Sequence, residues 1–196
     1  MTAIAGKGPR AWLGEVEQVD HAVYRAIAAT PTPALDGAMR RLSNAANYSR
    51  LSISSAAVLA IAGGPRGRRA AALGLSCVAT TATFVNVVVK PLSRRRRPDR
   101  EDAEVPEARH VKLPSSRSFP SGHTAAAVAF ATGVGRVMPG AAVPLHSLAA
   151  VVGYSRVHTG VHYPGDVLAG ALLGAIVTDV TAGALTKLTG PSSAAR

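Results

Sequence analysis

The stretch AAALGLSCVATTATFVNVVV, residues 70–89, contains no charged side chain. Its length is about the 20 residues that a predominantly apolar helix needs to cross the hydrocarbon core of a bilayer. Shorter or less regular apolar segments occur at 48–62, 124–137, 141–154 and 167–188. None of them alternates with a period of two, which argues against strands. The sequence therefore predicts an all-α fold, an integral membrane helical bundle with about five transmembrane helices. Because several segments are short, a soluble all-α bundle stays the alternative.

The N-terminal region has a different character from these segments. We expect a polar lead-in over residues 1–20, followed by short interfacial helices that lie on the membrane rather than cross it. Asp20 is the expected N-cap of the first short helix, and the second is expected over 34–46. The predicted parts are an N-terminal lead-in with amphipathic helices at 1–47, a helical-bundle domain at 48–188 and a C-terminal tail at 189–196.

The chain is strongly basic, with a formal net charge of +11 and 47% apolar residues. This charge suits nucleic acid, an anionic membrane surface or a phosphorylated substrate. Aromatic residues for base stacking make up only 4%, and the cations cluster beside apolar segments, so we expect no nucleic-acid partner. The predicted location is the cell membrane, with several passes and with membrane lipids as neighbours. Spans rich in Ala and Gly, such as AGALLGA, permit close helix pairing within one chain or in a homo-oligomer.

The order of the helices groups the polar residues. If the last four apolar segments are consecutive antiparallel helices, the end of one at Lys90, the start of the next at His123 and the loop 155–166 share one face. That face carries cations, histidines and a single carboxylate: Lys90, Arg97, Ser121, His123, Arg156, His162 and Asp166. Such a set fits a multiply charged anion. Ser121 and Gly122 begin a helix, whose free N–H groups also favour an anion.

Three motifs on this face resemble the signature of the type 2 phosphatidate phosphatase superfamily. They are KPLSRRRRP at 90–98, PSGH at 120–123 and SRVHTGVHYPGD at 155–166, all complete and in this order. The superfamily includes membrane lipid phosphate phosphatases, bacterial acid phosphatases and vanadium haloperoxidases. The resemblance extends over residues 48–188 and implies a phosphatase domain in that range.

The resemblance also implies a role for each residue. His162 would be the nucleophile that forms a phosphohistidine, and Asp166 would hold its other ring nitrogen. His123 would protonate the departing alkoxide and then deprotonate the incoming water. The phosphate would be bound by Lys90, Arg97, Arg156, Ser121 and Gly122. The implied reaction needs no metal and no other cofactor. Its implied substrates are lipid phosphomonoesters or diphosphates, either phosphatidate-like or polyprenyl.

Taken singly, each residue has a structural explanation. Asp166 and Ser121 stand where a helix N-cap is expected. Lys90 and Arg156, at the ends of apolar runs, could be anchors that extend to the membrane surface. The run RRRR at 94–97 could bind bilayer phosphates or draw an anionic headgroup toward the site. If each of these explanations were correct, the residues would share one face at the spacings of the motifs only by coincidence. The phosphatase hypothesis is therefore favoured.

Other functions stay open beside the lipid phosphatase. A soluble-substrate acid phosphatase would use the same motifs. A haloperoxidase would place vanadate in the same anion site, although a short chain rich in apolar spans argues against it. A non-enzymatic basic adaptor at the membrane surface would explain the charge but not the histidines. The sequence does not decide which side of the membrane the site faces.

Overall fold

The computed structural model describes residues 9–188, and no strand occurs in this range. The α-helices are α1 (Pro9–Ala29), α2 (Pro33–Ala45), α3 (Arg50–Ala62), α4 (Gly64–Thr83), α5 (Lys90–Leu92), α6 (Gly122–Val137), α7 (Pro139–His158) and α8 (Pro164–Leu188). Short helical turns lie at Asn47–Ser49, at Phe84–Val89, which is π-helical, and at Glu107–Arg109. The predicted all-α fold is confirmed.

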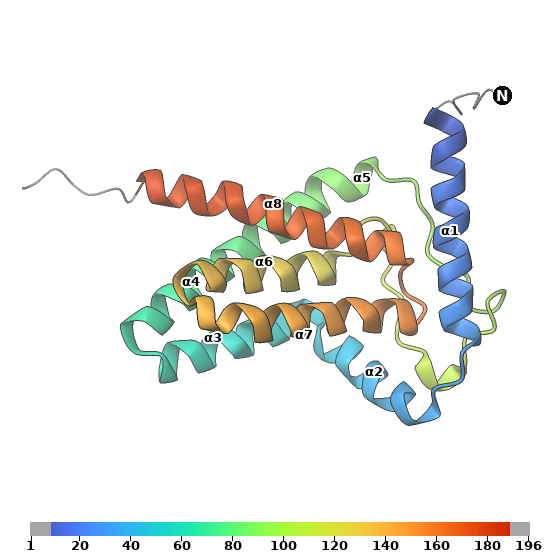
Figure 1. Cartoon of the computed structure of the whole chain (residues 1–196), viewed down its shortest axis with the longest axis horizontal. Helices are drawn as coiled ribbons and strands as arrows, with labels where there is room; N and C mark the ends of the chain where they lie inside the picture. Colours follow the sequence, from blue (N-terminus) through green and yellow to red (C-terminus); the bar gives the residue numbers. More distant parts are fainter. Residues whose placement is uncertain (1–8, 189–196) are drawn as a thin grey trace, which may run out of the picture.

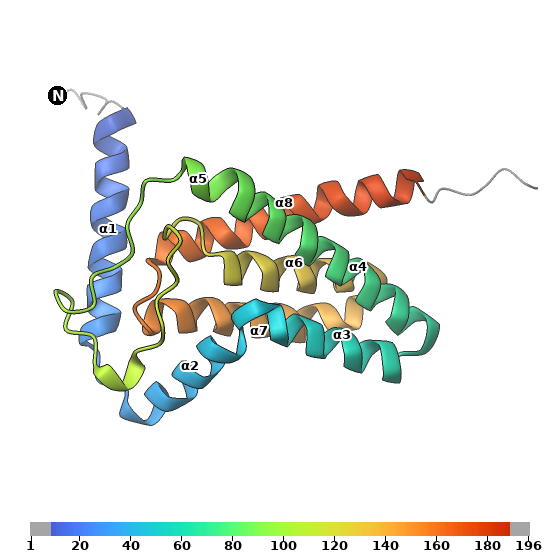
Figure 2. The same cartoon turned by 180° about the vertical axis from the view of Figure 1, so that it is seen from behind.

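Helix α6 lies at the centre of the bundle and contacts α4, α7 and α8, while α3 packs against α4. Figures 1 and 2 show α1 standing across one end of this bundle, roughly perpendicular to α6, α7 and α8. The irregular segment 93–121 crosses the same end. We call this end of the bundle the loop end.

Small residues let the central helices approach each other closely. A Cβ atom on Gly170 of α8 would lie 2.4 Å from the carbonyl oxygen of Ser121. One on Gly174 would lie 2.3 Å from that of Ala125. Both distances are below any real contact, so only glycine permits this approach. The backbones of α6 and α8 therefore touch directly, beginning at the residue that precedes α6.

Large apolar side chains line the outer face of α8. Leu168, Leu172, Ile176 and Val180 of α8 recur every four residues and are 57–68% exposed. Two helices in the described range are long and apolar enough to cross a membrane, Gly64–Leu92 and Pro164–Lys187. Only 28% and 22% of their apolar windows are buried, whereas a core helix of a soluble protein is mostly buried. An apolar exterior on helices of this length fits a lipid environment.

Each of the five expected apolar segments is helical. However, α3 has 13 residues and α6 has 16, which is short for a bilayer core. The number of transmembrane helices, about five, therefore stays a prediction. Only Gly63 separates α3 from α4, and the basic residues that follow it lie in the first turns of α4.

The prediction for the N-terminus was partly wrong. Helix α1 begins at Pro9, so Asp20 lies inside the helix and does not cap it. Tyr24 and Ala28 on the inner face of α1 pack against Val157 and Tyr163. This tertiary packing stabilises α1 as one helix, although acidic residues interrupt the apolar pattern of its sequence. The second short helix, α2, is close to its expected bounds. Residues 1–8 of the lead-in and the tail 189–196 lie outside the described residues.

Candidate active site

The structure brings all eight expected site residues to the loop end of the bundle. They come from the start of α5, the segment 93–121, the start of α6, the end of α7, the turn 159–163 and the start of α8. Helix order predicts this grouping. The residues are Lys90, Arg97, Ser121, Gly122, His123, Arg156, His162 and Asp166.

His162 and Asp166 form a buried pair with side chains at most 1% exposed. Their Nδ1 and Oδ2 atoms are 3.5 Å apart. Asp166 Oδ2 accepts hydrogen bonds from Ser118 Oγ at 2.6 Å and from the backbone N–H of Tyr163 at 3.0 Å. Ser118 Oγ also lies 3.4 Å from His162 Nδ1. The carboxylate is thus fixed on the Nδ1 side of the ring, which leaves Nε2 on the other side.

The surroundings of His162 favour the neutral form of its imidazole. Burial lowers its pKa to about 4, and the charge of Arg97 acts in the same direction, against the opposing effect of Asp166. Arg97 Nη1 lies 3.3 Å from Nε2, which fits an arginine N–H donated to an unprotonated ring nitrogen. The tautomer with its proton on Nδ1, toward Asp166, follows from these contacts.

Arg97 is held rigidly beside this ring. Its Nε donates to the carbonyl groups of Pro114 and Ser116 at 3.1 and 3.0 Å, and its Nη1 donates to that of Val161 at 3.0 Å. Lys90 Nζ donates to Ser116 Oγ at 3.1 Å. It would lie 3.6 Å from a Cβ on Gly122, which places the ammonium group over the start of α6.

Arg156 supplies a third cation, and this one is 1% exposed. Its Nη1 donates to the carbonyl oxygen of Ser43 at 3.0 Å and to the Ser43 hydroxyl at 2.6 Å. Its buried Nε–H has no hydrogen-bond partner among the described residues. An unpaired buried guanidinium N–H is costly, and an anionic oxygen is its natural acceptor.

Ser121 connects the start of α6 to α8. Its backbone N–H donates to the carbonyl oxygen of Asp166 at 2.9 Å, and its hydroxyl lies 2.9 Å from that of Thr124. The N–H of Ser121 is therefore already used. The first turn of α6, beginning at Gly122, still presents N–H groups that have no partner within a helix. They lie beside Lys90 and favour an anion there.

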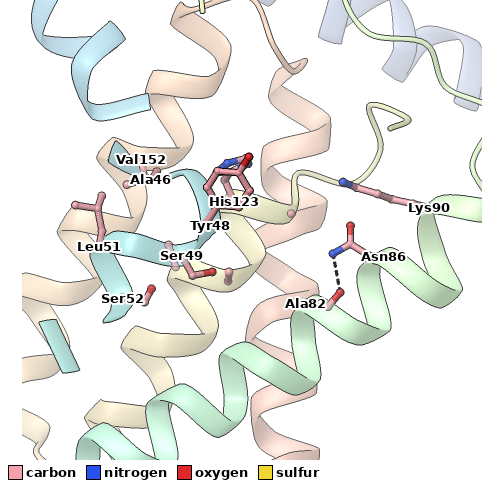
Figure 3. A pocket seen from close by; sticks show the side chains of 13 residues that line it. Ala46, Tyr48, Ser49, Leu51, Ser52, Ala82, Asn86, Lys90, His123 and Val152 are labelled. Atoms are coloured by element: carbon pink, nitrogen blue, oxygen red, sulfur yellow. Dashed lines mark hydrogen bonds between the residues drawn. The ribbon is translucent and has the colours of Figure 1, made fainter. Parts of the chain in front are cut away.

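His123 lines a pocket of about 250 Å³. Its Nε2 lies 2.9 Å from Asn47 Oδ1. Figure 3 shows Lys90 extending from the helix that carries Asn86 toward the side of the pocket that holds His123. Polar side chains of Tyr48, Ser49, Ser52 and Asn86 also line the pocket. Its other lining residues include small or apolar ones: Ala46, Leu51, Ala82, Ala126, Ala127 and Val152. His162 does not line this pocket, and Arg97 Nη1 lies 3.3 Å from its Nε2.

Several residues of the site were not predicted from the sequence. Ser118 binds Asp166, Asn47 binds His123, and Ser43 binds Arg156. Ser118 stands two residues before the PSGH motif, but no spacing rule connects a serine there to a distant aspartate. Arg95 was expected either to draw a headgroup toward the site or to bind bilayer phosphates. It instead forms an ion pair with Asp166, with 3.0 Å between Nη1 and Oδ1.

His158 lies within the third motif but outside the site. Its Nε2 is 2.9 Å from Thr32 Oγ1 and 3.3 Å from Asp36 Oδ1. Arg109, which is fully buried, donates to the same Asp36 oxygen at 2.8 Å. These contacts join α2 and the segment after α5 to α7. The contacts of His158 are therefore with residues that hold the fold together.

Known proteins share this fold and sequence pattern. The model of the PAP2 superfamily matches residues 70–188. A decaprenylphosphoryl-5-phosphoribose phosphatase of Mycobacterium tuberculosis is 41% identical over 103 residues, 50% of this chain and 52% of the relative. The chain thus spans about half the length of that relative. The protein of the same name from Mycolicibacterium smegmatis is 39% identical over 153 residues, 76% of this chain and 77% of the relative.

A solved structure has the same architecture across most of the chain. The transmembrane PAP2-type phosphatidylglycerolphosphate phosphatase of Bacillus subtilis superposes with a TM-score of 0.66 at 25% identity. The superposition includes 91% of this chain and 90% of that one. These relatives are phosphatases of phosphorylated lipids by name. The sequence match over more than half of the chain and the shared fold lead to one conclusion: the chain belongs to the PAP2 superfamily.

Proposed function

We propose that this protein is a multi-pass cell-membrane phosphatase that hydrolyses lipid phosphomonoesters or diphosphates through a phosphohistidine on His162, without a metal. The observation that carries the proposal is the contact between Arg97 Nη1 and His162 Nε2 at 3.3 Å, with Asp166 behind the ring. A neutral, oriented imidazole nitrogen next to a guanidinium is what attack on a phosphoryl group requires.

The first step would begin at His162 Nε2. Phosphate binding would draw Arg97 Nη1 from Nε2 to a phosphoryl oxygen, which frees the Nε2 lone pair. The lone pair attacks phosphorus, the bond from phosphorus to the ester oxygen breaks, and the ring becomes a phosphorylated imidazolium whose Nδ1–H faces Asp166. Arg97, Arg156 and Lys90 neutralise the charge that develops on the phosphoryl oxygens. His123 gives its proton to the leaving alkoxide, and the dianionic phosphate favours the protonated form of His123 beforehand.

The second step would reverse these roles. His123, now neutral, removes a proton from water, and the hydroxide attacks phosphorus and breaks its bond to Nε2. Inorganic phosphate leaves, and His162 and His123 return to their initial states. The three cations supply the positive charge that a metal supplies in other phosphatases.

A lipid substrate is supported by the surroundings of the site. The 250 Å³ pocket beside His123 has apolar as well as polar lining residues, and the bundle exposes its apolar side chains along α8. A headgroup phosphate bound at the loop end would leave its chain beside these apolar surfaces. The mycobacterial relatives are named for a polyprenyl-linked phosphate, so polyprenyl phosphates are the first class to test.

The test is phosphate release by the purified protein in detergent with EDTA present. The panel would contain phosphatidate, polyprenyl phosphates and diphosphates, and soluble phosphomonoesters. We expect release that prefers lipids, survives EDTA and is lost in His162→Ala. The matched control is His146→Ala, since His146 is an exposed histidine on α7 outside the site. A preference for soluble esters would support the acid phosphatase instead, and no release would favour the adaptor.

A further inference from the structure

Helix α1 lies outside the range matched by the superfamily model, yet it reaches the candidate active site. Asp20, in the middle of α1, is 8% exposed. Its Oδ1 accepts the backbone N–H of Gly165 at 2.7 Å, and its Oδ2 accepts from Arg95 Nη2. Gly165 directly precedes Asp166. A Cβ on Gly165 would lie 2.8 Å from Asp20 Oδ2, so the carboxylate packs directly on this backbone.

Arg95 connects the two carboxylates. One guanidinium nitrogen binds Asp20, and the other donates to Asp166 Oδ1 at 3.0 Å. Its Cζ also lies 4.3 Å from the ring centroid of Tyr163, a contact that holds the guanidinium plane in place. Only a planar fork can bridge two carboxylates in this manner, because a lysine presents a single point charge. Arg95 thus joins α1 to the first turn of α8.

Charge balance gives this arrangement a chemical consequence. Asp166 faces His162, whose ring becomes positively charged when it is phosphorylated. An arginine on Asp166 alone would cancel the charge that stabilises this imidazolium. Asp20 supplies a second negative charge, so Asp20, Arg95 and Asp166 together carry one net negative charge. Screening is weak in a buried site, so the negative charge that Asp20 adds affects the reaction more than it would in water.

We propose that Asp20 is a positioning residue, which acts through Arg95 to orient Asp166 and to keep one net negative charge behind His162. The proposal rests on the phosphohistidine mechanism proposed above. Asp20 lies in the N-terminal region, which the motifs do not include. It follows that α1 is needed for turnover as well as for packing.

The experiment compares Asp20→Asn, Arg95→Gln and the double variant, all full-length in detergent, with a lipid phosphate substrate. Asparagine keeps the acceptor for the Gly165 N–H and removes the charge. We expect Asp20→Asn to lower kcat about tenfold with KM changed less than twofold. Because Asp20 acts through Arg95, the double variant should lose no more activity than Arg95→Gln alone.

The control is Asp102→Asn, which removes another contact of α1 with the same segment, the exposed pair of Arg25 and Asp102 at 2.9 Å. It should keep the wild-type kcat. If Asp20→Asn fails to fold in a thermal scan, Arg95→Lys replaces it, since lysine keeps the charge but cannot bridge; its kcat should fall similarly.

Three outcomes would overturn the proposal: a wild-type kcat in Asp20→Asn, losses that multiply in the double variant, or an equal loss in Asp102→Asn. If His162→Ala is inactive while Asp20→Asn is fully active, the function stands and the role of Asp20 is wrong. If the wild type itself releases no phosphate, both proposals fall.

Discussion

Replacing Gly170 with alanine tests whether the close approach of α6 and α8 positions the site. The added Cβ would lie 2.4 Å from the carbonyl oxygen of Ser121. A carbon needs about 3.3 Å from such an oxygen, so α8 must move outward by about 0.9 Å. Asp166 lies one turn earlier on α8, and Ser121 donates its N–H to the Asp166 carbonyl.

A shift of this size would stretch the hydrogen bond between Ser118 Oγ and Asp166 Oδ2, now 2.6 Å, to about 3.5 Å, beyond useful length. Misplacement of a catalytic group by about 1 Å costs on the order of 100-fold in rate. Overpacking a core costs about 1–3 kcal/mol of stability. We therefore expect Gly170→Ala to fold, to melt at a lower temperature and to lose most of its kcat.

The assay is steady-state phosphate release from a lipid phosphate in detergent, together with a thermal scan of the same preparation. Gly183→Ala is the matched control on the same helix, because a Cβ there meets no atom within 4 Å. It should keep both kcat and melting temperature. Wild-type kcat in Gly170→Ala would refute the reasoning, as it would mean that the site tolerates displacement of α8.

Further substitutions distinguish hydrogen bonds that support activity from hydrogen bonds that support stability. Ser118→Ala removes a charge-assisted hydrogen bond worth about 1.5–3 kcal/mol, so kcat should fall about 10- to 150-fold in the phosphate-release assay; an unchanged kcat would exclude a role for Ser118. Arg109→Met leaves the carboxylate of Asp36 buried without its ion pair and should destabilise the protein by about 3 kcal/mol in denaturant unfolding; a loss below 1 kcal/mol would contradict this. Although burial opposes it, hydrogen bonds from Thr32 and Arg109 hold the pKa of Asp36 below its usual value. Asp36 therefore contributes stability at neutral pH that is lost as the pH falls below about 4, and this acid sensitivity should weaken in Arg109→Met.

Helix order and motif spacing were sufficient to place much of the site. Lys90 ends one apolar run and His123 begins the next, so antiparallel packing brings them to the same end without any knowledge of side chains. His162 lies in the turn between two further helices at that end, and Asp166 lies in the first turn of the second helix. Their positions depend on the lengths of apolar segments, which a sequence records directly.

The supporting residues depend on contacts that a sequence does not record. Asp20 fits an N-cap by local pattern, and only the packing of α1 across the loop end brings it to Arg95. Arg95 is one of four consecutive arginines, and nothing in the run distinguishes it from its neighbours. Ser118 is defined by the path of an irregular segment, which follows no periodic pattern.

The central claim is that His162 carries the phosphoryl group during turnover. The most direct measurement is a rapid alkaline quench of the protein during hydrolysis of a ³²P-labelled lipid phosphate, followed by mapping of the labelled residue. Phosphohistidine is labile in acid and stable in base, so the label should survive the quench and be lost on acidification. The mechanism predicts label on His162 in the wild type and none in His162→Ala. Phosphate release with no label on His162, or label on another residue, would contradict it.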